Sequence, residues 1–343
     1  MKKIFLISLV SIVVLLISAC GNETNSEPEN SNALTVYTTV YPLTYFTERI
    51  GGDHVNVESV YPAGSNEHTF DPTQKDMMSL ADADLFFYIG LGLEGFVENA
   101  KKTLANENVT MIATADAVSD DQLEGNQVEH HDEDSHEDDS HDENSHKDDS
   151  HDEDSHEEES HEDHNHGEID PHLWISPQIS VHLASSIKEA LIEKDAKNAE
   201  VYTSNYELLV DDLEELNTEY TEMANETTNK TFFVSHAAFG YLASQYGLEM
   251  VAVAGLNSQD EPSQKELTEI VNLAKEKNIK TILFEQNVSS NLAEIIQNEV
   301  GAQALTMHNL GVLTQQDIAN NEDYFTLMKK NLDTLKVALQ SSN

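Results

Sequence analysis

The order of apolar and polar stretches predicts an α/β fold. Outside residues 1–33 and 119–168, short apolar runs alternate with segments whose apolar residues recur at helical spacing. This order is typical of mainly parallel sheets flanked by helices. The predicted strands are 34–38, 55–60, 85–89, 109–113, 231–235, 248–253 and 281–284, and the predicted helices are 43–50, 74–81, 179–193, 199–227, 237–246 and 266–277.

The strands fall into two groups separated by the longest predicted helix. Residues 199–227 contain no glycine or proline, so this helix would span roughly 40 Å at a rise of about 1.5 Å per residue. A helix of that length can join two lobes as a stiff connection with limited hinge motion. We therefore predict a first lobe over residues 34–176, a helical linker over 177–228 and a second lobe over 229–343.

The first twenty residues have the pattern of an export signal. Lys2 and Lys3 precede a largely apolar run over residues 4–17, and Ile17-Ser-Ala-Cys20 resembles the lipobox of bacterial lipoproteins. We predict that residues 1–19 are a signal peptide and that Cys20 becomes lipidated. Residues 20–33 then form the lipid-anchored cysteine and a flexible tether, which attaches the protein to the outer side of the bacterial cell membrane.

Charge and cysteine content narrow the possible functions. The formal net charge is −46, which argues against nucleic-acid binding because phosphates require a basic surface. Cys20 is the only cysteine, so the chain has no intramolecular disulfide and no thiolate metal site. The charge favours cations as ligands.

The middle of the chain contains a repeat of histidines and acids. Histidines recur every five residues from His131 to His166, and residues 119–168 hold 23 of the 64 acidic residues. A period of five does not align histidines on one helical face, so we predict a disordered loop over about 119–168. Imidazoles and carboxylates bind borderline divalent metals, which makes this loop an auxiliary metal collector, although a solvated acidic spacer is the alternative.

Three histidines outside the repeat lie in loops where ligands commonly bind. His236 directly follows the strand 231–235, and His68 lies in the loop after the strand 55–60. His172 lies in the segment after the repeat. Three imidazoles on two lobes would hold a zinc ion in the cleft between them. We interpret His54, His182 and His308 instead as surface or hydrogen-bonded histidines, because they lack a comparable motif.

At these three loops the chain resembles the metal-binding solute-binding proteins of ABC importers, in particular the zinc-uptake lipoproteins. The resemblance rests on three motifs and on the His/acid-rich insertion before the second of them: Gly64-Ser-Asn-Glu-His-Thr-Phe-Asp-Pro72, Asp170-Pro-His-Leu-Trp-Ile-Ser-Pro177 and Ser235-His-Ala-Ala-Phe-Gly-Tyr241. It implies two α/β lobes joined by a long helix, with His68 and His172 as first-lobe ligands and His236 as the second-lobe ligand. In manganese-binding relatives the position of His236 is typically a carboxylate, so histidine there favours zinc over manganese.

The sequence differs from some of these relatives at Gly311, where they carry an acidic fourth ligand. The fourth position is then open to water, to Glu67 or to a residue of the repeat, and we favour water or Glu67. Glu285 and His308 are weaker alternatives.

The resemblance implies a monomer that captures zinc outside the cell membrane and passes it to a permease and its ATPase. The chain itself has no phosphate-binding loop to power transport. Three alternatives remain at this point. They are a protein that binds manganese or another divalent metal, an adhesin-like surface lipoprotein or zinc buffer, and a secreted zinc hydrolase, which the absence of an H-E-x-x-H helix disfavours.

Overall fold

The computed structural model describes residues 33–124, 127–128, 168–286 and 290–340. All helices and strands lie within one compact unit, Leu34–Asn343. The predicted signal peptide, Cys20 and the histidines of the repeat lie outside the described residues.

The first lobe is built on a four-stranded parallel sheet with the order β2-β1-β3-β4. Val36 on the strand β1 lies opposite Val57 on β2 and Leu85 on β3. These strands match the four predicted from the apolar runs. The strands and helices of this lobe are β1 (Leu34–Thr38), α2 (Tyr41–Gly51), β2 (Val55–Ser59), α3 (Gln74–Ala81), β3 (Leu85–Tyr88), α4 (Val97–Thr103) and β4 (Thr110–Ala113).

The second lobe repeats this architecture with a parallel sheet of order β10-β9-β7-β8. All six residues of β7 are buried, and its apolar centre Phe232-Phe233-Val234 suits a strand that is covered on both faces. The strands and helices are β7 (Thr231–His236), α8 (Gly240–Gln245), β8 (Glu249–Ala254), α9 (Gln264–Glu276), β9 (Thr281–Phe284), α10 (Asn291–Val300) and β10 (Gln303–Thr306).

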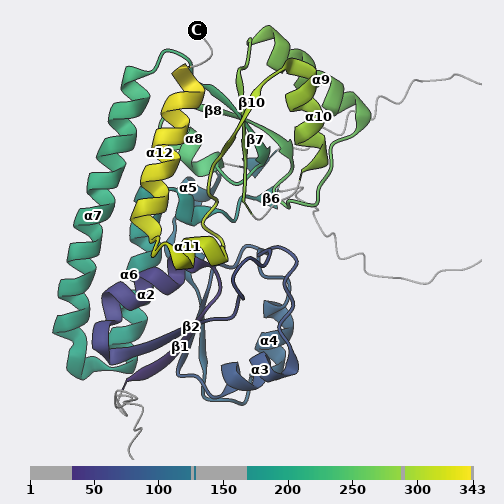
Figure 1. Cartoon of the computed structure of the whole chain (residues 1–343). Coiled ribbons are helices and arrows are strands. Elements are labelled where there is room, and N and C mark those ends of the chain that lie inside the picture. Colours follow the sequence, from purple (N-terminus) through teal and green to yellow (C-terminus); the bar gives the residue numbers. More distant parts are fainter. Residues whose placement is uncertain (1–32, 125–126, 129–167, 287–289, 341–343) are drawn as a thin grey trace, which may run out of the picture. The chain divides into compact units, whose positions relative to one another are not determined.

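The three longest helices that the structure describes are α6 (Pro177–Lys194), α7 (Ala199–Glu226) and α12 (Tyr324–Gln340), and α7 joins the two lobes. The helix α7 packs against α2 and α6 of the first lobe and against α12, which in turn packs on β7 and β9 (Figure 1). Buried Tyr220 on α7 donates a hydrogen bond of 2.7 Å to the Met328 carbonyl on α12. The predicted fold class, two mainly parallel lobes joined by a long helix, is confirmed.

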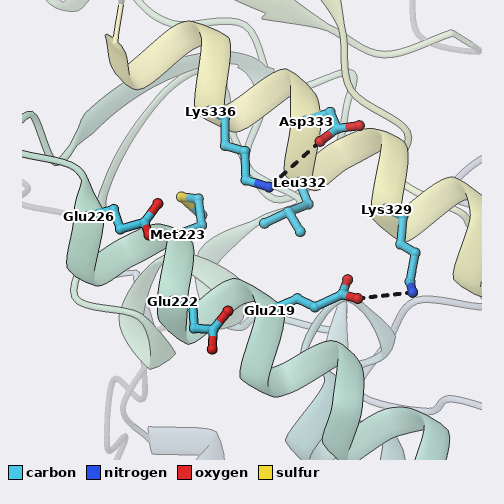
Figure 2. A pocket seen from close by; sticks show the side chains of 8 residues that line it. All are labelled: Glu219, Glu222, Met223, Glu226, Lys329, Leu332, Asp333 and Lys336. Carbon is cyan, nitrogen blue, oxygen red and sulfur yellow. Dashed lines mark hydrogen bonds and ion pairs between the residues drawn. The ribbon is translucent and has the colours of Figure 1, made fainter.

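The outer surface between α7 and α12 carries charged side chains (Figure 2). Lys329 of α12 pairs with Glu219 of α7 at 3.0 Å, whereas the pair of Lys336 with Asp333 at 3.7 Å lies within α12. Exposed pairs of this kind contribute at most about 1 kcal/mol each. The helix contact therefore depends mainly on apolar burial, and one cluster of buried side chains runs through both lobes, with Phe46, Trp174 and Leu283 among its members.

Several elements differ from the sequence predictions. The helix predicted over residues 237–246 begins only at Gly240, because Ala237 still donates to the Gly255 carbonyl beside β8 and Ala238 turns back onto the His236 carbonyl. The loop predicted over about 119–168 begins too early and ends too late, since α5 (Asp120–Glu124) and the antiparallel pair β5 (Gln127–Val128) and β6 (Glu168–Ile169) fall within it.

The apolar pattern did not lead us to predict α4, α10, β10, α11 (Gln315–Ala319) or α12. Short 3-10 helices complete the fold at Gly52–His54, Thr114–Ala117, Leu173–Ile175 and Ala196–Asn198. Among the helices described, none combines the length and apolarity that a membrane crossing requires.

Candidate metal centre

Three imidazoles from distant parts of the chain meet at one point. One ring nitrogen each of His68, His172 and His236 lies within 4.8 Å of the other two. The ring centroids are 5.2 Å apart for His68 and His172, 5.2 Å for His68 and His236, and 4.9 Å for His172 and His236. His172 and His236 are fully buried, and His68 is half-buried. The three histidines selected from the sequence are therefore brought together.

The loop after β2 positions His68 through its neighbours. The Asn66 side chain accepts a hydrogen bond of 2.9 Å from the His68 backbone N–H, which closes a local turn. The amide nitrogen of the same side chain donates to Ser258 Oγ at 3.1 Å, and Ser258 follows β8 of the second lobe. Tyr61 donates to the Glu67 carbonyl at 3.2 Å. The loop is thus fixed both within its own lobe and across the cleft.

His172 is oriented by Asp170, two residues before it. Asp170 Oδ1 accepts from the His172 backbone N–H at 2.9 Å and lies 2.8 Å from His172 Nδ1. Because a carboxylate accepts, the ring carries its proton on Nδ1, and the lone pair of Nε2 is directed toward the triad. Tyr241 of the second lobe donates to the Asp170 carbonyl at 2.8 Å. Ser176 caps α6 immediately afterwards by accepting from the Ile179 N–H.

His236 is the last residue of β7, and Glu285 directly follows β9. The two strands are adjacent and parallel, so their carboxyl ends place both side chains at one edge of the sheet. His236 Nδ1 lies 3.1 Å from Glu285 Oε2, and His236 Nε2 lies 2.9 Å from the Leu256 carbonyl. Burial alone would lower the pKa of His236, but the charge of Glu285 and these two hydrogen bonds raise it to about 9.

His68 has the opposite electrostatic environment. Burial, followed by the proximity of His172 and His236, lowers the pKa of His68 to about 2. Its imidazole is therefore neutral and offers a lone pair. His172 Nε2 and His68 Nε2 lie only 3.2 Å apart. At this distance one ring nitrogen donates a hydrogen bond to the other, and a cation bound by both rings would take the place of that proton.

Glu67 lies beside the triad and is almost completely buried. Burial raises the pKa of Glu67. Its Oε1 accepts a hydrogen bond of 2.8 Å from Asn309 Nδ2, whereas its Oε2 is buried and makes no hydrogen bond within the part of the chain that the structure describes. A Cβ on Gly311 would lie 2.6 Å from Glu67 Oε1, so the Glu67 carboxylate fills the space beside that glycine.

The remaining histidines outside the repeat lie apart from the triad. His308 Nε2 lies 3.0 Å from Asp317 Oδ2, and His308 Nδ1 accepts from the Leu310 N–H at 2.9 Å. His182 Nε2 is 3.4 Å from Gln122 Nε2, and the ring of His54 meets Tyr202 edge-on. In the described ranges, His68, His172 and His236 form the one histidine, cysteine or acid cluster with metal-binding geometry.

Asp170 and Asn309 are functional neighbours of the triad that the sequence motifs did not predict. Asp170 has a local signal, because an acid two residues before a histidine can accept from that residue's backbone and ring. Asn309 has no such signal. Its partners Glu67 and Glu285 are 242 and 24 residues away in the sequence.

Residues 36–338 match the family model described as zinc-uptake complex component A, periplasmic. The chain belongs to this family. It is 32% identical over 332 residues to the high-affinity zinc uptake system protein ZnuA of Bacillus subtilis strain 168, and the match covers 96% of both chains. It is 33% identical over 340 residues to the zinc-binding lipoprotein AdcA of Streptococcus pneumoniae strain R6, a match that covers 98% of this chain but 61% of AdcA.

Solved structures agree with the fold and with the family. The Zn(II)-bound ZnuA-like domain of Streptococcus pneumoniae AdcA superposes with a TM-score of 0.67 at 30% identity, covering 90% of this chain and 99% of that domain. The laminin-binding protein Lbp of Streptococcus pyogenes superposes with a TM-score of 0.70 at 26% identity, covering 90% of this chain and 100% of that one. The resemblance inferred from the three sequence motifs is confirmed.

Proposed function

We propose that this protein binds zinc outside the cell membrane and delivers it to an ABC importer. The observation that carries the proposal is the convergence of one ring nitrogen each from His68, His172 and His236 within 4.8 Å. Imidazole nitrogen suits zinc, whereas manganese prefers oxygen ligands. Membership of the zinc-uptake family supports the same metal.

His68, His172 and His236 are the proposed protein ligands, and the fourth position is taken by Glu67 or water. Zinc commonly has four ligands in a tetrahedral arrangement. The buried Glu67 Oε2, which has no hydrogen-bond partner among the described residues, supports Glu67. Glu285 lies against His236 Nδ1, and His308 against Asp317, so neither is part of the proposed ligand set.

Two carboxylates orient the histidines around the ion. Asp170 accepts from His172 Nδ1, which leaves Nε2 for the metal. Glu285 likewise lies against His236 Nδ1, but Nε2 of this ring is bonded to the Leu256 carbonyl, a hydrogen bond that zinc binding would replace. Because a coordinating imidazole must be neutral, zinc binding replaces a proton on His236.

Delivery requires partners, which we propose to be a membrane permease and its ATPase. Ligands from both lobes would couple zinc binding to the relative position of the lobes, which α7 joins. A signal peptide over residues 1–19 and lipidation at Cys20 would hold the protein, as a monomer, near the permease. The proposed division into lobes at residues 34–176 and 229–343 with a linker at 177–228 fits this arrangement, and the histidine repeat acts as an auxiliary collector.

Zinc titration by calorimetry tests the binding site. The wild-type protein is expected to show one tight site, and His236→Ala should lose it. His182→Ala is the matched control, because His182 lies apart from the triad next to Gln122 and should leave the tight site intact. Tight binding that survives in His236→Ala would contradict the proposed site.

Two other functions share these residues and need different experiments. The likeness to the laminin-binding protein Lbp raises an adhesin role, and a zinc buffer would need no importer. If the protein supplies an importer, deleting its gene should abolish growth in medium from which zinc has been chelated. Deleting the permease gene should have the same effect. Unchanged growth would favour the buffer or the adhesin. Hydrolysis of ester or peptide substrates only by zinc-loaded protein would favour a hydrolase.

A further inference from the structure

Asn309 links a carboxylate of each lobe beside the histidine triad. Its side-chain Nδ2 donates to Glu67 Oε1 at 2.8 Å and to Glu285 Oε2 at 2.8 Å. Glu67 lies in the loop after β2 of the first lobe, whereas Glu285 directly follows β9 of the second. Asn309 itself is buried, with 2% of its surface exposed. A single uncharged amide group therefore satisfies two buried carboxylates that come from opposite sides of the site.

The orientation of this amide is fixed by the surrounding backbone. The Gly311 N–H donates to Asn309 Oδ1 at 3.0 Å, so the oxygen end of the amide is identified and the NH₂ group must face the carboxylates. Trp174 Nε1 donates to the Asn309 carbonyl at 2.6 Å and holds the main chain. Neither end of Asn309 can turn without breaking a buried hydrogen bond.

The segment that carries Asn309 also joins the two lobes. It follows β10 of the second sheet. Shortly afterwards the Gly311 carbonyl accepts from the Tyr41 N–H at 2.9 Å, and the Leu313 carbonyl accepts from the Gly64 N–H at 2.9 Å. Tyr41 begins α2, and Gly64 lies in the loop that leads to His68. The position of Asn309 is therefore set by both lobes.

Each carboxylate held by Asn309 is tied to a histidine of the triad, because Glu67 precedes His68 in the chain and Glu285 lies against His236. The bond to Glu67 occupies Oε1, whereas the buried Oε2 has no hydrogen-bond partner among the described residues. The bond to Glu285 is made by the same oxygen, Oε2, that lies 3.1 Å from His236 Nδ1. Loss of the amide would remove the donor that the two carboxylates share, although the charge of Glu285 opposes a charge on Glu67.

We propose that Asn309 is a positioning residue of the metal site, whose amide, bonded on its other side to Glu285, holds the Glu67 carboxylate in place for the ion. This inference rests on the proposed zinc-binding function. It predicts that Asn309 affects zinc affinity through Glu67, although Asn309 is not itself a ligand. A purely structural role would instead lower stability without depending on Glu67.

A double-mutant cycle with zinc as the probe tests the inference. Affinity is measured for the wild type, Asn309→Leu, Glu67→Gln and the double variant, each as the full mature chain. Leucine matches the size of asparagine but has no donors. We expect Asn309→Leu to weaken zinc binding about ten- to hundredfold in the wild type, as is usual for partners of metal ligands, but to change it by less than about threefold in Glu67→Gln. If Asn309→Leu does not fold, Asn309→Ser takes its place in the cycle.

Co²⁺ provides a readout that a merely structural role would not move. The visible absorption of bound Co²⁺ depends on its ligand set, so Asn309→Leu should alter the spectrum. Asn205→Leu is the matched control: Asn205 on α7 donates to the Ile50 carbonyl at 3.0 Å, remote from the triad, so its loss should lower stability and leave the spectrum unchanged.

The outcomes separate this inference from the function on which it rests. Wild-type protein that binds no zinc would overturn the proposed function and this inference with it. Tight zinc binding by the wild type, together with an unchanged affinity in Asn309→Leu, would overturn the inference alone. An equal loss of zinc affinity on Asn309→Leu in the wild type and in Glu67→Gln would also overturn the inference.

Discussion

The carboxylate of Glu67 occupies the space that a side chain at Gly311 would need. A Cβ at residue 311 would lie 2.6 Å from Glu67 Oε1 and 2.7 Å from its Cδ. The resemblance to the zinc-uptake lipoproteins implies an acidic ligand at this position in some relatives. In this chain the carboxylate of Glu67 fills that space, and it fits there only because residue 311 has no side chain.

Replacing Gly311 with alanine should displace Glu67. The added methyl group meets a buried carboxylate that is already hydrogen-bonded to Asn309, and such overpacking typically costs about 1–3 kcal/mol. We expect a lower free energy of unfolding for the metal-free protein and zinc affinity reduced by about tenfold or more. Denaturant titration and zinc calorimetry measure the two effects.

Gly95→Ala is the control for this substitution. A Cβ at Gly95 would meet no atom within 4 Å, so both stability and zinc affinity should stay close to wild type. Wild-type zinc affinity in Gly311→Ala would show that Glu67 does not contribute to the site.

Asp170→Asn should weaken zinc binding without removing a ligand. The carboxylate of Asp170 accepts from both the backbone and Nδ1 of His172, and loss of its charge reduces the hold on the ring and the basicity of Nε2. A loss of about ten- to hundredfold in affinity is expected, measured by competition with a chelator. Asp195→Asn is a suitable control, because buried Asp195 also accepts two hydrogen bonds, from Asn198 and Tyr202, but has no contact with the triad. Equal affinities for Asp170→Asn and Asp195→Asn would contradict the orienting role.

Deleting residues 129–166 should preserve one tight zinc site and remove weaker ones. The triad contains none of these residues, whereas binding by a repeat that its sequence predicts to be disordered must overcome about 1–2 kcal/mol of backbone entropy for each residue that it orders. Zinc titration of the deleted protein measures both classes of site. A full-length variant in which the histidines of the repeat are changed to asparagine shows how much of the weaker zinc binding comes from the imidazoles and how much from the acidic side chains. Loss of the tight site in either variant would move the principal site into the repeat.

Asp317 should contribute stability that disappears in acid. Asp317 Oδ2 accepts from His308 Nε2 and from the backbone and hydroxyl of Thr314 at the start of α11. These hydrogen bonds, led by the one from His308, lower the pKa of Asp317. A depressed pKa means that the folded state favours the ionised form, so the stabilisation is present above the unfolded pKa of about 3.9 and is lost as the pH falls below it toward the folded pKa.

Denaturant titrations from pH 7 to pH 3 compare the wild type with Asp317→Asn. We expect the wild type to be more stable by about 1 kcal/mol at neutral pH, and the difference to shrink in the acid range. Asp333→Asn serves as the control, since the Asp333 side chain is 80% exposed and its Lys336 partner is 3.7 Å away. A difference that stayed constant down to pH 3 would contradict the role of the Asp317 charge.

The sequence by itself determined the strands that build the two sheets and the three histidines that meet between them. Short runs rich in apolar residues, such as residues 34–38 and 231–235, predict strands without knowledge of the rest of the chain, because a strand buried in a parallel sheet is recognisable from its own composition. His68 and His236 were found because each follows a predicted strand, and His172 because of its motif. The elements β10 and α12 were missed for different reasons: β10 is a four-residue strand with little apolar character of its own, whereas α12 has a helical spacing of apolar residues that the sequence already contained.

Only the tertiary structure decided how the acids are arranged around the histidines. Asn309 bonds a glutamate 242 residues earlier in the chain, and Gly311 accommodates that same carboxylate. No periodicity or motif connects these residues, because their distances depend on how the segment after β10 crosses from the second lobe to the first. Tertiary packing therefore decided which acid lies beside the triad, whereas the sequence alone supplied the histidines.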